Sequence, residues 1–262
     1  MSENILEISN LSKYFGGIAA VSDCPLNVKR GSMTGIIGPN GSGTTTLFNL
    51  IAGNLKSSNG YVTFDEENIT DVPSYELFSK GLLRTFQIAH EFTNLSVLEN
   101  LMMVPGNQSG EKIMTALFKP GLVAQEEAVI KDKAKEVVDF LNLGHLSNEL
   151  AGNLSGGQKK LLELGRTMMV DAKLVLLDEV GAGVNRTLLK DLGTAIEKLN
   201  REKGYTFCMI EHDMDFIGRL CDPVIVMAEG SVLFEGSVEE AKKDEKVIES
   251  YLGRGSKLKD TK

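Results

Sequence analysis

The first quarter of the chain alternates apolar and polar residues over short stretches. Residues 5–8, 25–28 and 61–64 show this alternation, which is typical of half-buried strands, so antiparallel strands are predicted there. Residues 32–37 predict a further strand that runs into a glycine-rich loop, and residues 45–51 predict a helix after it. This part of the chain is therefore expected to combine a small antiparallel sheet with a strand–loop–helix segment.

The second half of the chain alternates strands with helices. Continuous apolar residues over 173–178 and 205–210 predict two buried strands, and between them a helix is predicted to begin at Asn185 and end at Gly204. Such alternation is typical of a parallel sheet covered by helices. The sequence therefore predicts an α/β fold with a mostly parallel sheet.

The C-terminal segments predict a hairpin and one helix. The hairpin pairs residues 224–227 with residues 232–234 across a turn at Glu229 and Gly230. The last helix is predicted to open at Ser237, because a glutamate follows three residues later in the spacing of a capping box.

The middle of the chain shows no convincing strand and is expected to form an inserted, mostly helical subdomain. A stripe of apolar residues predicts a helix over 126–143, whereas residues 105–125, with several prolines and glycines, are expected to be the most irregular part. One domain is predicted, with an α/β body over about residues 1–84 and 165–252, the helical subdomain over about 85–164, and a polar tail over 253–262.

Composition and charge narrow the function classes. The 262 residues are 42% hydrophobic and 24% charged, and 36 acidic against 28 basic side chains give a net charge of −8. A general nucleic-acid binder needs a basic surface, so that class is disfavoured. No apolar run approaches the roughly 18–20 residues that cross a bilayer. With no signal peptide evident and three scattered cysteines, an intracellular chain with reduced thiols is expected.

The glycine-rich loop carries the first candidate chemistry. It has the spacing G-x-x-x-x-G-K-[ST] of phosphate-binding loops, except that threonine occupies the lysine position. Its glycines allow backbone N–H groups to face an anion, and the following helix adds its dipole. Taken alone, the segment could equally be a tight strand-to-helix turn. The loop consists of Gly38, Pro39, Asn40, Gly41, Ser42, Gly43, Thr44 and Thr45.

Two further motifs favour nucleotide chemistry. Asp178 and Glu179 end a predicted buried strand, where an acidic pair can support Mg2+ through water and place a carboxylate beside an attacking water. Before them, a serine and two glycines open a predicted helix and can present a hydroxyl and a closely approaching backbone to a phosphate. This motif consists of Leu154, Ser155, Gly156, Gly157 and Gln158.

The motif at residues 154–158 resembles the signature sequence of ABC-type ATPases. The phosphate loop, the acidic pair, Gln87 and His212 complete that family's set of motifs in the right order. The resemblance covers residues 4–252. It implies an ABC-type P-loop ATPase with a mostly parallel sheet core, an N-terminal antiparallel β subdomain and an inserted α-helical subdomain, and with ATP and Mg2+ as cofactors.

The resemblance also implies how ATP is held. The phosphate loop and Thr46 would bind the phosphates, and Phe15, or the adjacent Tyr14, would stack on the adenine. In a dimer of two ATPases, each chain's signature motif would close the other chain's site. That half of the site would come from Ser155, Gly156, Gly157 and Gln158.

The catalytic roles follow from the same resemblance. Glu179 would position or activate the attacking water, and His212 would contact the γ-phosphate. Thr45 would ligate Mg2+ and Asp178 would support it. Gln87 would sense the metal and the γ-phosphate where the membrane partner docks.

Two residues depart from the family pattern. Val180 replaces the proline that normally follows the acidic pair, which is expected to alter only loop stiffness. Thr44 removes the phosphate-loop lysine, so strongly impaired turnover is expected at this chain's own loop. A deliberate single substitution is favoured because the other motifs are retained, and a naturally degenerate site is the alternative.

Within the family, the chain is similar to the ATPase subunits of importers for branched-chain and other hydrophobic amino acids, on residues 14–17, 84–87, 182–185, 210–214 and 247–253. This implies a peripheral subunit at the cytoplasmic face of the plasma (inner) membrane. The implied partners are two transmembrane permease subunits, a second ATPase subunit in a heterodimer rather than a homodimer, and, indirectly, a solute-binding protein.

Several alternatives stay open. Importers of urea or another small solute and some lipid-related exporters carry similar ATPases, and a nucleotide-binding subunit with little or no hydrolysis would also fit Thr44. A non-transport ATPase of DNA repair or translation is disfavoured. The chain has neither a long coiled-coil insertion nor a second cassette, and its acidic charge argues against a nucleic-acid partner.

Overall fold

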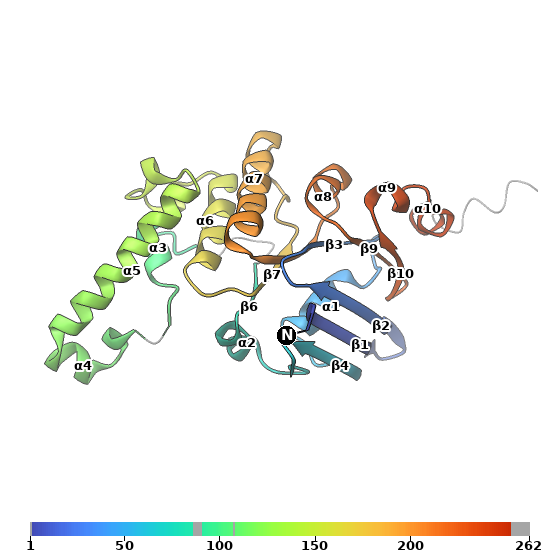
Figure 1. Ribbon diagram of the computed structural model, residues 1–262, viewed down its shortest axis with the longest axis horizontal. Coiled ribbons are helices and arrows are strands. Elements are labelled where there is room, and N and C mark those ends of the chain that lie inside the picture. The colour runs from blue at the N-terminus through green and yellow to red at the C-terminus, as the bar shows by residue number, and fades with distance from the viewer. Residues whose placement is uncertain (1, 86–90, 107, 253–262) are drawn as a thin grey trace, which may run out of the picture. The chain divides into compact units, whose positions relative to one another are not determined.

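The computed structural model describes residues 2–85, 91–106 and 108–252, and the chain divides into two compact units. The first, named the α/β unit, comprises Met1–Arg84, Lys173–Gly181 and Glu197–Lys262. The second, named the helical unit, comprises Thr85–Ala172 and Ala182–Ile196. All strands of the described residues belong to the α/β unit (Figure 1).

The larger sheet of the α/β unit positions the motif residues. Its strand order is β10-β9-β3-β8-β7-β6, and every pairing is parallel except that of β10 with β9. All residues of β7 and β8 are buried, as expected for central strands of a parallel sheet. The strands are β3 (Met33–Ile37), β6 (Leu82–Arg84), β7 (Leu174–Asp178), β8 (Thr206–Ile210), β9 (Val224–Ala228) and β10 (Ser231–Gly236).

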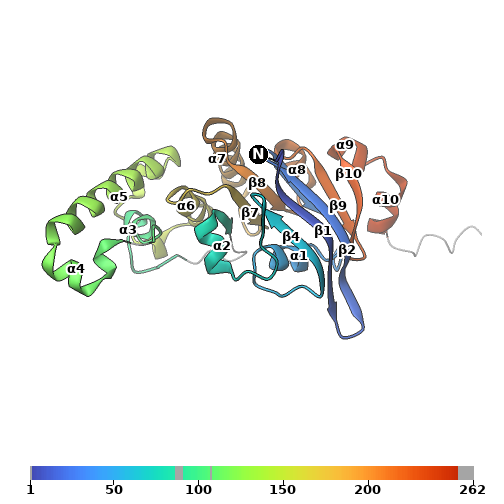
Figure 2. The ribbon, with the colours of Figure 1, turned by 60° about the horizontal axis from the view of Figure 1, so that its bottom comes forward.

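The smaller sheet is antiparallel, and Figure 2 shows its longer strands running side by side. Leu6 pairs with Val28 on one side and with Phe64 on the other. Register shifts interrupt the first pairing, and Asn10 has a φ of 52°. Because these irregularities break the apolar–polar alternation, the sequence pattern indicated only residues 5–8 and 25–28 of two strands that are each 12 residues long. The order β2-β1-β4-β5 comprises β1 (Asn4–Phe15), β2 (Ile18–Lys29), β4 (Asn59–Phe64) and β5 (Glu67–Asn68).

One buried cluster fixes α1 (Thr44–Ile51) against both sheets. Leu47 and Phe48 of this helix are fully buried, and the same cluster contains Phe64 of the smaller sheet and Leu176 of the larger one. The loop that precedes α1 is therefore anchored by the core. The other helices that lie wholly in this unit are α2 (Ser74–Lys80), α8 (Met214–Leu220), α9 (Val238–Ala241) and α10 (Glu245–Leu252), while α7 (Arg186–Lys203) contains residues of both units.

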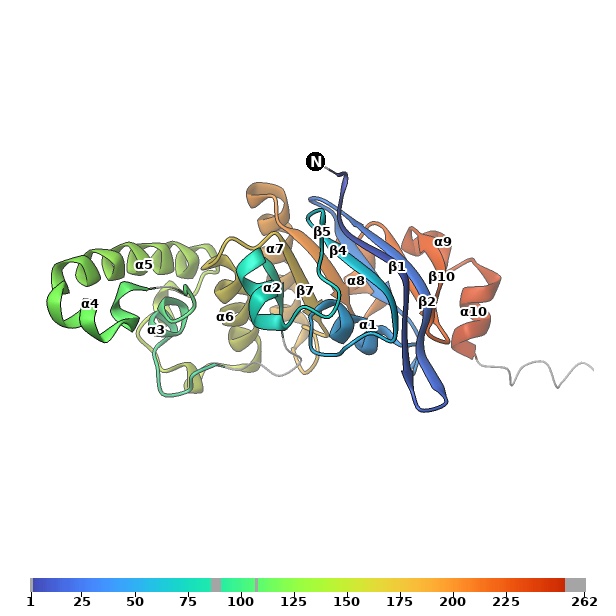
Figure 3. The same cartoon turned by 90° about the horizontal axis from the view of Figure 1, so that it is seen from below.

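The helical unit is built around α5 (Pro120–Phe140), which packs against α3 and α6, with α4 alongside it (Figure 3). Gly165 allows the close approach of α5, because a Cβ there would lie 3.1 Å from the Val137 side chain of this helix and 2.7 Å from that of Leu141, which follows it. No helix of the described residues is long and apolar enough to cross a membrane. The other elements are α3 (Val97–Met102), η1 (Ser109–Glu111), α4 (Ile113–Phe118), η2 (Gly144–Leu146), η3 (Ala151–Asn153) and α6 (Gly156–Met168).

The α/β class with a mostly parallel sheet and an antiparallel part is confirmed, but two predictions about helices were wrong. Residues 105–125, expected to be irregular, contain η1, α4 and the start of α5. Pro120 begins α5 at a position that proline favours, so it opens a helix rather than breaking one. The single last helix is two helices, α9 and α10, because Asp244 accepts the Val247 N–H and caps a new one.

Candidate functional site

The loop between β3 and α1 requires glycine at defined positions. Gly41 and Gly43 have φ values of 82° and 98°, in the left-handed region that glycine adopts without strain. A Cβ on Gly43 would lie 2.3 Å from the backbone oxygen of Ala20, and one on Gly38 would lie 2.5 Å from that of Met227. The loop therefore packs tightly against β2 and β9 in one conformation.

The N-terminus of α1 offers its backbone N–H groups to a ligand. Within the described residues, no side chain caps this helix and no acidic side chain lies in its first turn. The first N–H groups of a helix have no partner inside it, and the helix dipole favours an anion there. The loop shape and the uncapped helix together fit a phosphate group.

Two neighbouring threonines of the loop sit in different environments. Thr44, at the lysine position, is only 8% exposed, whereas Thr45 is exposed at the start of the helix. Thr44 cannot make the charge-assisted hydrogen bonds that a lysine ammonium makes to phosphate oxygens. The Thr45 hydroxyl is the kind of oxygen ligand that suits Mg2+.

Asp178, at the carboxyl end of β7, is held by an arginine that sequence reasoning missed. The Arg84 Nη2 donates to Asp178 Oδ2 at 2.7 Å, and its Nη1 donates to Asn49 Oδ1 at 2.7 Å. The side chains of Arg84 and Asp178 are 11% and 8% exposed. Arg84 is the last residue of β6, which pairs with β7, so its role depends on a strand pairing that the sequence does not display.

Glu179 and His212 meet at the same edge of the sheet. The His212 Nε2 lies 3.1 Å from the Glu179 Oε1. Glu179 has a φ of 47°, which is rare for a residue other than glycine. Its N–H donates to the Ile210 backbone oxygen at 2.9 Å. The turn after β7 is therefore tied to the end of β8, and it brings together two residues that the sequence singled out.

Glu211 is a buried acid that the sequence analysis did not identify. Its Oε1 accepts the Gly181 N–H at 2.7 Å. Burial raises the pKa of Glu211 and the nearby Glu179 raises it further, whereas hydrogen bonds from the Gly181 and His212 backbones lower it. An acid between a buried strand and a candidate catalytic histidine was the available signal.

The signature motif leads into α6 of the helical unit and supplies its cap and its first residues. Ser155 caps the helix by accepting the Gln158 N–H, and the Gln158 Oε1 accepts the Ser155 N–H at 2.9 Å. A Cβ on Gly157 would lie 2.7 Å from the Leu188 Cβ, but one on Gly156 would meet nothing within 4 Å. Packing therefore requires glycine at position 157, whereas the space beside Gly156 is open.

The structure leaves two other predicted contacts untested. Tyr14 and Phe15 are both about half exposed, at 44% and 49%, and Lys13 Nζ lies 5.3 Å from the Phe15 ring centre. Either aromatic ring could stack on a base. Gln87 lies outside the described residues.

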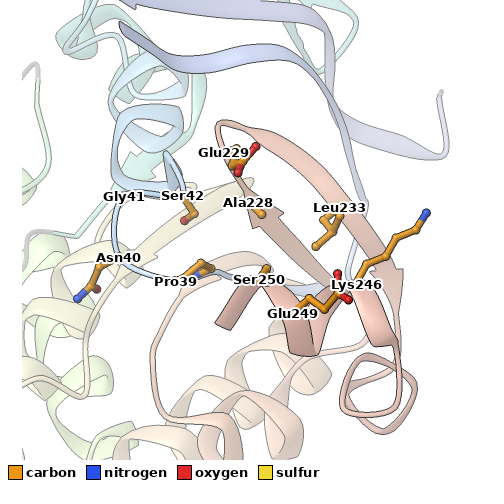
Figure 4. Close-up of a pocket in the computed structure, with 10 residues that line it drawn as sticks. All are labelled: Pro39, Asn40, Gly41, Ser42, Ala228, Glu229, Leu233, Lys246, Glu249 and Ser250. Carbon is orange, nitrogen blue, oxygen red and sulfur yellow. The ribbon is translucent and has the colours of Figure 1, made fainter. Parts of the chain in front are cut away.

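A cavity of about 610 Å³ borders the outer side of the phosphate loop (Figure 4). Pro39–Ser42 form one wall, and residues of β9, β10 and α10 form the others. Glu229 and Glu249 also line it, while the Lys246 side chain extends away from the loop in Figure 4. Carboxylates repel phosphate, so this cavity is less suited to the phosphates than the N-terminus of α1.

Comparisons with known proteins point in one direction. The family described as "ABC transporter" matches residues 21–182. "Probable branched-chain amino acid transport ATP-binding protein LivG" of Archaeoglobus fulgidus is 42% identical over 249 residues, which cover 95% of each chain. The protein of the same name from Methanocaldococcus jannaschii is 40% identical over 95% of this chain and 97% of its own length.

A solved structure agrees with these relatives. A nucleotide-free ATP-binding cassette from an ABC transporter has a TM-score of 0.82 and 38% identity, and the match covers 96% of this chain and 100% of that one. With relatives this similar along nearly its whole length, the chain belongs to the ABC transporter family as one of its ATP-binding subunits, a class of ATPases.

Proposed function

We propose that this chain couples ATP binding and hydrolysis to the uptake of branched-chain or other neutral hydrophobic amino acids, at the cytoplasmic face of a membrane. The observation that carries the ATPase part is the 3.1 Å contact between Glu179 and His212. This contact lies at the end of β8, the strand next to β3, which leads into the uncapped N-terminus of α1. The proposed substrate class rests on the names of the relatives.

Each residue then has a chemical task. The N–H groups of the phosphate loop and the start of α1 bind the β- and γ-phosphates, and Phe15 or Tyr14 stacks on the adenine. Glu179 holds the attacking water in line and accepts its proton, while His212 contacts a γ-phosphate oxygen.

Mg2+ would bind to phosphate oxygens and water, with Thr45, Asp178 and Gln87 as protein partners, and would neutralise charge that develops on the phosphates. Thr45 and Asp178 supply the hard oxygen atoms that this ion prefers. No cluster of three His, Cys, Asp or Glu side chains that could hold a metal occurs in the described part of the chain. A nucleotide-bound Mg2+ does not require one.

The signature motif is proposed to serve a second ATPase subunit. A Cβ on Gly156 would meet nothing within 4 Å, so the space beside the backbone at the start of α6 is open to a phosphate carried by a partner chain. A heterodimer is favoured because it would keep one site that Thr44 does not affect. That site would consist of the partner's phosphate loop and this chain's signature motif. Two permease subunits and a solute-binding protein complete the proposed importer.

One observation favours a second candidate function. Thr44 is buried and uncharged at the lysine position, so this chain could bind nucleotide with little or no hydrolysis and leave turnover to its partner. Uptake would then depend on the partner's phosphate loop and on this chain's signature motif.

The test is reconstitution of the chain with its permeases and partner ATPase in proteoliposomes, with the solute-binding protein added outside. ATPase activity and uptake of leucine, with urea as the comparison solute, are measured for this chain and for its Thr44→Lys variant. ATP-dependent leucine uptake supports the proposal. ATPase activity that only urea stimulates contradicts the amino-acid assignment, and equal turnover with and without the lysine contradicts an impaired site.

A further inference from the structure

Glu211 is a buried carboxylate that the proposed chemistry does not use. It is 5% exposed and lies between the last residue of β8 and His212. Its Oε1 accepts the Gly181 N–H at 2.7 Å, and the next residue in the chain, His212, contacts Glu179. The Glu211 side chain therefore joins the turn after Glu179 to the segment that contains His212.

The turn that Glu211 holds has an unfavourable conformation. Glu179 is in the left-handed region, and such residues persist only where the surrounding structure fixes them. Two backbone anchors do so here. The Glu179 N–H donates to the Ile210 oxygen, and the Gly181 N–H donates to Glu211.

A third contact completes the arrangement. His212 lies 3.1 Å from the Glu179 carboxylate. Three successive residues at the end of β8 thus hold the turn. Ile210 holds the Glu179 backbone, Glu211 holds the Gly181 backbone and His212 contacts the Glu179 side chain. Within the described residues, these contacts join the turn after β7 to the end of β8, in addition to the pairing of the two strands themselves.

The carboxylate is well suited to this task. A charged acceptor makes stronger hydrogen bonds to N–H groups than a neutral one does, and burial excludes competing water. The same burial makes the group costly to keep if its donors are removed. The Glu211–Gly181 bond therefore favours a single conformation of the turn.

We propose that Glu211 is a positioning residue, which accepts the Gly181 N–H and so fixes the turn at residues 179–181 in the orientation that directs the Glu179 carboxylate at His212 and the attacking water. The inference rests on the proposed role of Glu179 in hydrolysis and gives a task to a residue to which the resemblance assigned none.

The test uses the full-length chain with Thr44→Lys as the reference, so that hydrolysis is measurable. Glu211→Leu removes the acceptor at similar volume, and Glu211→Gln removes the charge but keeps an acceptor oxygen. Gly181→Pro removes the donated N–H and leaves Glu211 intact, so its hydrolysis rate and KM for ATP provide a second route should the leucine variant fail to fold. Hydrogen exchange of the peptide that spans residues 179–183 is measured together with single-turnover hydrolysis and the KM for ATP.

We expect Glu211→Leu to speed exchange at Gly181 by about tenfold or more. Its hydrolysis rate should fall about 10- to 100-fold with the KM for ATP changed by less than about twofold, because misplacement of a catalytic group acts on the chemical step. Glu211→Gln should retain both properties within about threefold.

The inference is overturned if the leucine variant matches the reference in exchange and rate, or if the glutamine variant loses as much as the leucine variant. A rise in KM that accounts for the whole loss would also overturn it, because that result indicates altered nucleotide binding. If the reference does not hydrolyse ATP, the proposed function fails, whereas exchange at Gly181 still decides whether Glu211 holds the turn.

Discussion

The imidazole of His212 lies 3.1 Å, through its Nε2, from the Glu179 Oε1, although the two residues follow different strands. Because β7 and β8 are parallel neighbours, their carboxyl ends meet at one edge of the sheet. This contact restricts rotation of the Glu179 carboxylate before any substrate binds. An active site that is organised in advance loses less free energy to rearrangement during the reaction.

Glu179→Gln should slow hydrolysis by about 10²–10³-fold, because the amide cannot accept the proton of the attacking water. ATP binding should change little, since glutamine keeps an oxygen that can bond to His212. Single-turnover phosphate release and equilibrium ATP binding, both in the Thr44→Lys background, measure the two effects. Glu202→Gln, on the exposed part of α7, is the matched control, and equal rates for both variants would exclude the assigned role.

Thr44→Lys should restore charge-assisted hydrogen bonds to the phosphates, each worth about 1.5–3 kcal/mol. The gain in hydrolysis is expected to be about 10²–10³-fold. Thr44→Met introduces a side chain about as long as lysine but without its charge, so it separates the effect of length from the effect of charge. ATP titration and steady-state ATPase assays decide the matter, and an equal gain from methionine would show that length, not charge, limits this site.

The two glycines of the signature motif should respond differently to alanine. Gly157→Ala forces a Cβ against Leu188 and should destabilise the helical unit by about 1–3 kcal/mol. Gly156→Ala meets no atom and should be neutral or more stable by roughly 0.5–1 kcal/mol. Urea unfolding measures both.

The order of the two substitutions should be reversed for ATP-dependent dimerisation, which Gly156→Ala should weaken more than Gly157→Ala. Gly156→Ala places a methyl group where the partner chain's phosphate would approach, so ATP-dependent dimerisation should weaken in a chain that remains fully folded. Sedimentation with and without ATP, on a Thr44→Lys background, tests this. A stable Gly157→Ala protein, or normal dimerisation of Gly156→Ala, would contradict the assignment.

Asp65 should make the stability of the α/β unit depend on pH. Hydrogen bonds from Lys173 and Arg30 lower the pKa of its carboxyl group below the ordinary value of 3.8. A lowered pKa stabilises the folded chain above the ordinary value, and this stabilisation is lost as the pH falls through the folded-state value. Asp65→Asn should therefore cost up to about 1 kcal/mol at pH 7, as is usual for partly exposed pairs.

The difference between Asp65→Asn and the unsubstituted chain should shrink when unfolding is measured toward pH 3. Glu66→Gln, at the neighbouring position, is the control for loss of one acidic charge. A difference that stays constant over this range would show that the carboxylate charge of Asp65 is not what stabilises the fold.

The helical unit exposes an aromatic side chain suited to a membrane partner. Phe92 is 48% exposed, and Arg166 lies 5.8 Å from its ring centre. If a short permease helix docks near Phe92 and Leu95, then Phe92→Asp should release the chain from permease-containing membranes, because a charge would enter an apolar contact. Tyr75→Asp, at an exposed aromatic residue of α2, is the control in a co-purification assay, and retention of both variants would exclude this surface.

Local sequence rules predicted the parts of the site that depend on neighbouring residues. The loop around Gly41 and Gly43 follows from the backbone freedom of glycine, and the cap at Ser155 coincides with a motif at known spacing. Buried apolar runs before Asp178 and His212 placed both at strand ends. The prediction of helix breaks failed where Pro120 starts α5, because proline is compatible with the first turn of a helix.

The contacts between distant segments could not be predicted in this way. Arg84 reaches Asp178 only because β6 pairs with β7, and Glu211 reaches Gly181 only because the turn after β7 lies beside the end of β8. Such contacts depend on strand order, and one sequence without its fold does not specify that order. The residues that orient the motifs are therefore harder to identify than the motifs themselves.

The parallel pairing of β6 with β7 has a consequence for how the chain can be shortened. Leu82 pairs with Leu174 and Arg84 with Leu176, so the chain leaves one end of β6 and must return to the opposite end of β7. Residues 85–172 are thus a crossover connection between adjacent strands. Parallel strands cannot be joined by a tight turn, and about a dozen residues or more are needed. If the helical segment were excised, its replacement would have to be a linker long enough to run from the carboxyl end of β6 to the amino end of β7.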